Sequence, residues 1–307
     1  MTEVEVSFDS DRVRLAGTLA LPDGPGQFPV VVLISGSGQV DRNENHRRLR
    51  IDFFRETATH LADQGIMTLR YDKRGVGASE GDYWETGFFD NVADASAAIS
   101  YVKYHERSHA DAIYLLGHSE GALIATRLAG QGNEIAGIIL IAGSARPGEN
   151  VLKWQAQKVA EGTGGFNGWL IRTLHIDVLK AQQKQLDKIK KSTKDSLRIQ
   201  LFAKINAKWM REFMAYDPAE DLARIQVPVL AITGTKDIQT DPADLKRMAE
   251  LVRSDFEYHQ IPDLTHILRS EEGAPTLSTY KKQAQRPTDS RVLGLVSQWL
   301  RSKSAVS

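Results

Sequence analysis

The first residues of the chain alternate between apolar and polar side chains. Residues 4–8 show this pattern, and residues 13–17 repeat it after the turn-forming residues 9–11. Alternation with a period of two is typical of a strand with one buried face, and turn residues between two such strands predict a hairpin. We therefore expect an antiparallel hairpin at the edge of a sheet.

From Pro29 onward the apolar residues form short continuous runs, which are typical of strands buried on both faces of a parallel sheet. Stretches with helical spacing lie between these runs, so strands and helices alternate. The pattern predicts an α/β fold with a mostly parallel, doubly wound sheet. The expected strands are residues 30–34, 67–71, 113–116, 138–141, 227–232 and 256–261, and the expected helices include residues 54–61, 92–102, 122–128 and 245–252.

The alternation breaks between about residues 147 and 218, where large apolar residues recur in a stretch that is rich in Lys and Gln and poor in strand-like runs. We interpret this stretch as a helical insertion that caps the carboxyl edge of the sheet. The core domain then comprises residues 1–146 and 219–307, and the cap, or lid, comprises residues 147–218. Residues 162–165 are expected to form a turn within the cap, and the polar end of the chain is expected to fray.

The composition excludes several classes of protein. Of the 307 residues 41% are hydrophobic and 25% are charged, which is typical of a soluble globular protein. Lys plus Arg and Asp plus Glu both number 39, so no net charge favours binding to nucleic acid or stable membrane association. Cysteine is absent, which excludes disulfides and thiolate sites. The N-terminus does not resemble a signal peptide, so a cytoplasmic location is expected, and a homo-oligomer stays open.

A Gly-x-Ser-x-Gly motif at residues 117–121 falls directly between a predicted strand and a predicted helix. This context makes the motif far more specific than the pentapeptide alone, because it is typical of a serine held on a sharp strand-to-helix turn. Side chains at Gly117 and Gly121 would collide with neighbouring backbone. We therefore predict that Ser119 is a nucleophile and that the backbone N–H of Glu120 points at a developing oxyanion.

A serine hydroxyl needs an imidazole to remove its proton and an acid to orient that imidazole. His266 follows the last predicted strand, where the chain order serine, acid, histidine places the base. Asp237 ends the preceding strand-loop unit, 29 residues before His266. Asp241 lies further into the same loop and Asp263 follows the final strand, so both are weaker candidates. The predicted catalytic triad is Ser119, Asp237 and His266.

The second oxyanion donor is expected in residues 35–42, the loop after the first parallel strand. The glycines of this loop allow its backbone to turn N–H groups inward. Ser37 is the first choice by position, and Gly38 and Gln39 are the alternatives.

Residues 72–79, Asp-Lys-Arg-Gly-Val-Gly-Ala-Ser, follow the next predicted strand. They lack the Lys-Ser or Lys-Thr ending of a phosphate-binding loop, so we interpret them as structural, with Asp72 and Arg74 bracing the loops beneath the site. The sequence also lacks the HExxH, EF-hand and nucleotide-binding glycine motifs. We expect neither a metal nor a cofactor.

The motifs at residues 72–79 and 117–121, with the later Asp237 and His266, resemble those of the α/β-hydrolase superfamily. Residues 35–42 are similar to the oxyanion loop of a bacterial serine esterase and dienelactone-hydrolase-like group, although that loop often begins with His-Gly and here begins with Ser-Gly. The resemblance covers nearly the whole chain outside the cap. It implies an esterase or related acyl hydrolase with a lid-like helical cap and indicates no substrate. Together with the predicted triad, it leads us to expect a serine carboxylesterase that hydrolyses a small to medium ester through an acyl-enzyme.

Two alternatives to an esterase stay open. A serine peptidase, amidase or thioesterase would use the same triad and differ in its pocket and leaving group. A non-catalytic ligand-binding protein could have the same fold, because fold does not determine function.

The large side chains of the cap either line an apolar acyl pocket or form the core of the cap itself. The candidates are Trp154, Trp169, Trp209, Met210 and Met214. Residues 180–212 carry ten Lys or Arg and three acidic residues, a local net charge of +7. This stretch is either a solvated helix face or a surface that attracts an anionic substrate or partner.

Overall fold

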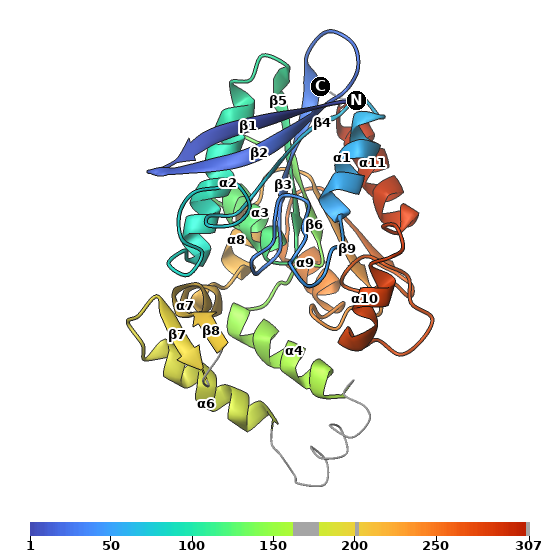
Figure 1. Ribbon diagram of the computed structural model, residues 1–307. Coiled ribbons are helices and arrows are strands. Elements are labelled where there is room, and N and C mark those ends of the chain that lie inside the picture. Colours follow the sequence, from blue (N-terminus) through green and yellow to red (C-terminus); the bar gives the residue numbers. More distant parts are fainter. Residues whose placement is uncertain (162–177, 200–202, 305–307) are drawn as a thin grey trace.

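The computed structural model describes residues 1–161, 178–199 and 203–304 (Figure 1). Within these residues the central sheet has eight strands. In their order across the sheet, the strands are β1 (Thr2–Ser10), β2 (Val13–Leu21), β4 (Met67–Tyr71), β3 (Phe28–Ile34), β5 (Ser108–His118), β6 (Gly137–Ile141), β9 (Val229–Gly234) and β10 (Phe256–Ile261). Strand β2 pairs antiparallel with β1 and β4, and all pairs from β4 to β10 are parallel. The predicted parallel sheet with an antiparallel N-terminal hairpin is confirmed.

Helices cover both faces of this sheet. The alternation along β3 shows why, because Val30 and Val32 belong to one hydrophobic cluster and Val31 and Leu33 belong to the other. The first cluster includes residues of α2 (Phe88–Lys103) and α3 (Glu120–Gly130), and the second includes residues of α1 (Phe53–Ala62) and α11 (Ser290–Ser304). Full burial of one such side chain stabilises the fold by about 1.5–3 kcal/mol. The continuous apolar runs thus provide a core on each side of the sheet.

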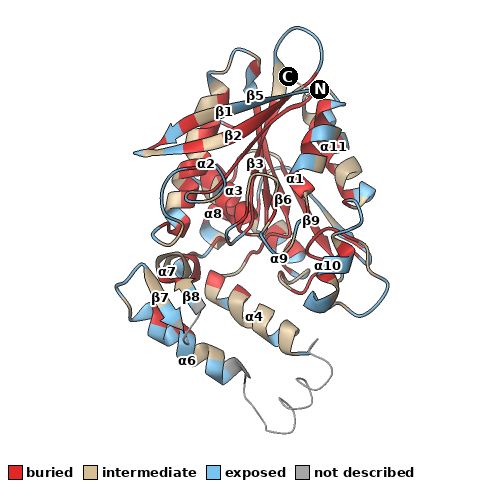
Figure 2. Ribbon diagram, viewed as in Figure 1, coloured by how far each residue is buried: buried red, intermediate tan, exposed pale blue. Residues whose placement is uncertain are grey.

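The solvent exposure of the strands follows their place in the sheet. Every residue of β6 and β9 is buried, whereas most residues of the edge strand β1 are exposed. Figure 2 shows buried residues concentrated on the central strands and intermediate or exposed residues dominating α4 (Gly148–Glu161) and α6 (Val178–Lys190). The remaining helices of the core are α8 (Ala219–Arg224), α9 (Asp244–Leu251), the 3-10 turn η1 (Leu277–Thr279) and α10 (Tyr280–Gln283).

The chain leaves the sheet after β6 and returns to it at β9, which is the neighbouring strand. The cap elements between them are α4, α6, β7 (Ser196–Ile199), β8 (Ala203–Asn206) and α7 (Ala207–Ala215). They lie together beyond the end of the sheet where β6 ends (Figure 1). The Gly148 N–H donates to the Tyr216 carbonyl (3.1 Å), so the two crossings between core and cap lie side by side.

Strands were not expected in the cap, but β7 and β8 form an antiparallel pair there. Leu197 and Ile205 are partners in this pair, and both pack against the small cap cluster of Leu186, Ile189, Ala207 and Met214. Strands of four residues are too short to show a clear alternation. The predicted turn at residues 162–165 and Trp169 lie outside the described residues. No described helix has the length and apolar character needed to cross a membrane.

Candidate active site

Ser119 occupies a strained turn between β5 and α3. Its φ of 56° and ψ of −115° are unusual for a residue with a side chain. A Cβ added at Gly117 would lie 2.1 Å from the Gly121 carbonyl oxygen, and one added at Gly121 would lie 1.9 Å from the Ile34 oxygen. Both distances are shorter than any real contact, so only glycine fits at either position. The local sequence therefore determines the geometry that presents Ser119.

His266 and Asp237 meet at the carboxyl ends of β10 and β9. The His266 Nδ1 atom lies 2.8 Å from Asp237 Oδ2 and 3.0 Å from Oδ1. Asp237 Oδ1 also accepts the backbone N–H groups of Gln239 (2.8 Å) and Thr240 (2.9 Å), which fixes the carboxylate. Since an ionised carboxylate only accepts hydrogen bonds, Nδ1 is the donor in this contact, and in a neutral imidazole Nε2 is then the acceptor. This is the protonation that a general base needs.

The two competing acids lie elsewhere. Asp241 pairs with Arg146 (2.7 Å), and Asp263 pairs with Lys236 (2.8 Å). Of the three carboxylates considered from the sequence, Asp237 is the one hydrogen-bonded to His266.

His118, the neighbour of Ser119 in the chain, connects the two halves of this site. Its Nε2 lies 3.0 Å from the backbone oxygen of His266, and the two imidazole rings have centroids 4.9 Å apart. Within the described residues Ser119 Oγ makes no hydrogen bond to His266. Contacts between a nucleophile and its base are often long before substrate binds and shorten in the complex. The structure thus brings His266 beside the nucleophile turn without a formed Ser119–His266 bond.

A cavity of about 40 Å³ lies against Ser119. Ser37 and Glu120 line it, whereas Gly38 and Gln39 are not among the described residues that do. Glu120 is the first residue of α3, so its backbone N–H has no acceptor within the helix and is available to an oxyanion. The described lining residues are Ser37, Ser119, Glu120, Leu123, Ala142, Ser144, Val151, Leu152, Gln155, Trp209, Phe213 and Thr240.

Of the four described cap residues considered for substrate binding, one lines the cavity, two pack in the cap cluster, and Trp154 does neither. Trp209 lines the cavity and stacks on Phe213, with ring centroids 4.7 Å apart. Met214 belongs to the cap cluster and Met210 packs against it. Neither is among the described residues that line the cavity. Trp154 is also absent from that lining, and its ring lies under the Lys158 ammonium group.

The side chain of Glu120 is a feature that the sequence analysis missed. Although it is buried, its carboxylate accepts from Lys73 (2.8 Å), from Asn91 (2.9 Å) and from the indole N–H of Trp209 (2.7 Å). A buried charge must be paired, so an acidic residue inside the nucleophile motif was a signal that a partner had to exist. The motif alone could not identify Lys73, which lies on another loop.

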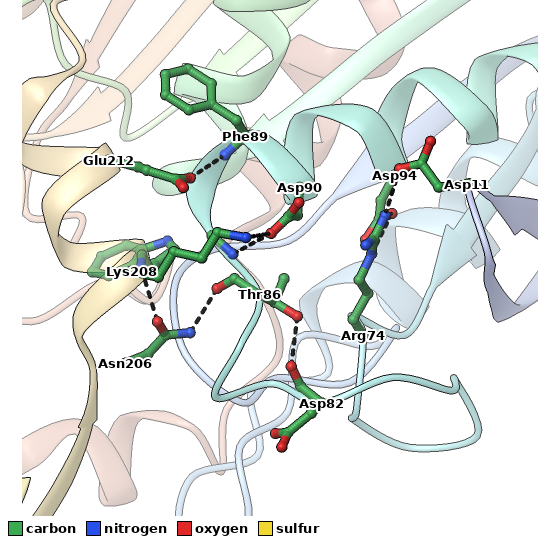
Figure 3. A network of polar contacts seen from close by, with 12 residues as sticks. Asp11, Arg74, Asp82, Thr86, Phe89, Asp90, Asp94, Asn206, Lys208 and Glu212 are labelled. Atoms are coloured by element: carbon green, nitrogen blue, oxygen red, sulfur yellow. Dashed lines mark hydrogen bonds and ion pairs between the residues drawn. The ribbon is translucent and has the colours of Figure 1, made fainter. Parts of the chain in front are cut away.

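Asp72 and Arg74 make the contacts of bracing residues. Asp72 accepts from the backbone N–H (2.8 Å) and the guanidinium (2.8 Å) of Arg42, which lies at the end of the oxyanion loop. Arg74 pairs with Asp94 of α2 (2.7 Å) and extends toward Asp11 of the hairpin (Figure 3). Both residues therefore link loops and helices around the site.

Helix α7 is fastened to the amino-terminal end of α2 by three polar side chains (Figure 3). The Asn206 amide donates to two backbone carbonyls in the loop before α2 (2.6 and 2.7 Å). Lys208 pairs with Asp90 (2.7 Å), and Glu212 accepts a backbone N–H at the start of α2 (2.9 Å). The part of the cap that contributes Trp209 is thus attached directly to the core.

None of the Lys and Arg residues of the basic stretch lines the cavity at Ser119, although Trp209 of the same stretch does. An open groove of about 660 Å³ is lined by Lys180, Gln183, Lys184, Asp187, Lys188, Lys191, Ser192, Lys194 and Leu197, none of which lines the Ser119 cavity. Acids outside the stretch neutralise part of its charge, since Lys190 pairs with Glu149 (2.5 Å). In the described part of the chain no cluster of three or more His, Cys, Asp or Glu could hold a metal ion.

Comparison with known proteins places this geometry in a family. The family model described as "Serine aminopeptidase, S33" matches residues 47–273, a span that contains Ser119, Asp237 and His266. Esterase EstD of Thermotoga maritima is 30% identical over 290 residues, which are 93% of this chain and 65% of EstD. The chain therefore spans about two thirds of the length of that relative.

Solved structures share the fold at low sequence identity. Est1E from Butyrivibrio proteoclasticus, with ferulic acid bound, has a TM-score of 0.66 at 18% identity, with 98% of this chain and 99% of Est1E covered. Proline iminopeptidase from Mycobacterium smegmatis has a TM-score of 0.64 at 12% identity, with 99% of each chain covered. The chain has the α/β-hydrolase fold that its motifs resemble and belongs to the serine aminopeptidase S33 family.

Proposed function

We propose that the protein is a serine carboxylesterase that hydrolyses small to medium, uncharged esters. The observation that carries this proposal is the character of the cavity beside Ser119. Half of its twelve described lining residues are apolar, and Glu120 supplies the only carboxylate among them. Three donors already bind that carboxylate, so it has little capacity to attract a cationic substrate. The volume of about 40 Å³ favours a small acyl group, and the similarity to EstD supports ester hydrolysis.

In the proposed reaction Ser119 Oγ attacks the acyl carbonyl carbon while His266 Nε2 takes its proton. Asp237 holds the imidazole in the required tautomer and stabilises the imidazolium. The backbone N–H groups of Glu120 and of the Ser37 region donate to the oxyanion. The alcohol leaves with a proton from His266, and the acyl group stays on Ser119. Water, deprotonated by His266, then attacks the acyl carbon, the bond to Ser119 Oγ breaks, and Oγ takes the proton back from His266 as the carboxylic acid is released.

A panel of p-nitrophenyl esters of increasing acyl length tests the proposal. We expect turnover of the short esters and labelling of Ser119 by a fluorophosphonate, with both lost in Ser119→Ala. A purified protein that neither turns over any ester nor becomes labelled would instead be a non-catalytic binder, and the proposal would be wrong.

The family description favours aminopeptidase activity as the second candidate. An aminopeptidase has to bind the ammonium group of its substrate, and a carboxylate is the ordinary partner of that group. The Glu120 carboxylate is held by Lys73 at 2.8 Å, which opposes this use. We therefore expect aminoacyl p-nitroanilides and acyl-thioesters to react more slowly than esters. A higher kcat/KM on aminoacyl amides would reverse the order of the two candidates.

A further inference from the structure

A buried histidine and a buried glutamate lie directly behind the predicted triad, and the proposed reaction uses neither of them. His118 Nδ1 lies 2.8 Å from Glu44 Oε1, and each side chain is only 4% exposed. The same Glu44 oxygen accepts the backbone N–H of Gly36 at 2.7 Å. One carboxylate oxygen thus joins the oxyanion loop to the strand that carries Ser119.

The conformation of the loop that carries Glu44 places the side chain of this residue in the protein interior. Glu44 itself has a φ of 66°, which is a strained conformation for a residue with a side chain. Asp41 holds the turn, because its carboxylate accepts the backbone N–H groups of Asn43 (2.9 Å) and Asn45 (3.0 Å). A conformation that costs free energy persists only where other contacts require it, and the contacts here are those of the Glu44 carboxylate.

Both ring nitrogens of His118 face acceptors. Nε2 lies 3.0 Å from the backbone oxygen of His266, which can only accept. Nδ1 faces Glu44 Oε1, which already accepts from Gly36, while Oε2 is buried with no hydrogen-bond partner among the described residues. A proton on Oε2 would have no acceptor among the described residues. The proton between Nδ1 and Oε1 is assigned to Nδ1, because imidazole is the more basic of the two groups. Both imidazole nitrogens then carry protons, Glu44 is ionised, and each of these groups has its hydrogen bond.

The charges around His118 agree with this assignment. Burial alone would lower the pKa of His118, but the Glu44 carboxylate, with smaller contributions from the His266 carbonyl and from Asp237, raises it above its ordinary value. The other group that faces the ring is His266, and Phe53 of α1 contacts it edge-on with centroids 5.7 Å apart.

We propose that His118 is an imidazolium paired with Glu44, and that this pair is a positioning device for the active site. The pair holds three separate segments together: the oxyanion loop through Gly36, the nucleophile strand through His118, and the His266 loop through the His266 carbonyl. Neither residue is among the described residues that line the cavity, so the pair acts through the groups that it positions. The kinetic part of this inference rests on the proposed esterase function.

Two conservative substitutions test the positioning role. Glu44→Gln keeps the shape and an acceptor oxygen but removes the charge, and His118→Gln keeps one donor but cannot be cationic. We expect each to lower kcat on p-nitrophenyl acetate by about 10- to 100-fold, because small displacements of reacting groups have effects of that size, with KM changed by no more than about twofold. The rate of fluorophosphonate labelling should fall in parallel. His60→Gln is the matched control, since His60 is a half-buried histidine that contacts Ser297 instead.

Changes in KM alone, or variants with an unchanged kcat per titrated active site, would overturn the positioning role. Unfolded protein cannot account for a lower kcat, because kcat is calculated per active site that reacts with the fluorophosphonate.

The protonation state is tested without any reference to activity. In protein labelled with ¹⁵N-histidine, we expect two protonated ring nitrogens for His118 at about pH 7, with the resonance assigned by its absence in His118→Gln. A ring with one unprotonated nitrogen would overturn the imidazolium. This spectrum can support the pair even if the wild-type protein hydrolyses no ester, so the two proposals can fail separately.

Discussion

At the scale of the residue, the geometry of the predicted triad depends on very few side chains. Asp237 has its orientation fixed by two backbone N–H groups before it meets His266. The sequence singles out Ser119, Asp237 and His266 as candidates because each follows a predicted strand at a characteristic place. It could not predict Glu44 or the partners of Glu120, because those contacts join segments that no local pattern relates.

Replacing Asp237 tests the orienting role. In Asp237→Asn the amide can donate to His266 Nδ1 and favour the wrong tautomer, so we expect kcat for ester hydrolysis to fall by about 10³- to 10⁴-fold. Asp241→Asn serves as the control, because Asp241 pairs with Arg146 and does not contact His266. Equal activity in the two variants would contradict the assignment of Asp237.

The close approach of α3 to β3 makes a prediction about stability. Gly121→Ala should lower the free energy of unfolding by about 3 kcal/mol or more, because the new Cβ would meet the Ile34 carbonyl oxygen at 1.9 Å. Gly294→Ala in α11 has open space around it, so it should stabilise the protein by about 0.5–1 kcal/mol through helix propensity. Denaturant unfolding of both variants measures the difference, and a neutral Gly121→Ala would show that the turn relaxes easily.

At the scale of the element, the sequence predicts each of the six parallel strands described in the sheet, and for two of them it also predicts the bounds. The expected bounds of β4 and β10 agree with the structure. Strand β5 begins at Ser108, five residues before the apolar run that predicted it. The sequence missed these first residues because most of them are exposed and carry no apolar pattern, and the register with β3 shifts after Phe28. The pair β7 and β8 escaped prediction because packing in the cap, rather than a long alternating pattern, stabilises it.

The attachment of α7 can be weakened at one residue. Asn206→Ala removes the side chain that accepts the Trp209 backbone N–H and donates to two carbonyls before α2, so we expect the local stability of α7 to fall by about 1–2 kcal/mol. Hydrogen exchange of residues 207–215 should accelerate while the exchange of β5 and β6 stays unchanged. Ser192→Ala, which removes a contact within the cap alone, is the control. Uniform acceleration across the whole protein would indicate global destabilisation and contradict the prediction.

At the scale of the whole molecule, stability should depend on pH through His118. Its pKa is raised in the folded protein above the ordinary 6.5 by the Glu44 carboxylate, in spite of burial. The stabilisation from this group is therefore fully present below pH 6.5 and is lost as the pH rises through the folded pKa. We expect the difference in Tm between wild type and His118→Gln to be larger at about pH 6 than at about pH 9. A difference that grows with pH would contradict the sign.

The two ends of the cap lie next to each other, and this affects how the cap can change during evolution. Gly148 and Tyr216 are joined by a backbone hydrogen bond, so the whole segment between them can be lengthened, shortened or exchanged without moving β6 or β9. Selection for new substrates can thus act on one stretch of the gene while the codons for the reacting groups stay constant. Proteins with this arrangement can therefore change the substrates that they bind more readily than the reaction that they catalyse.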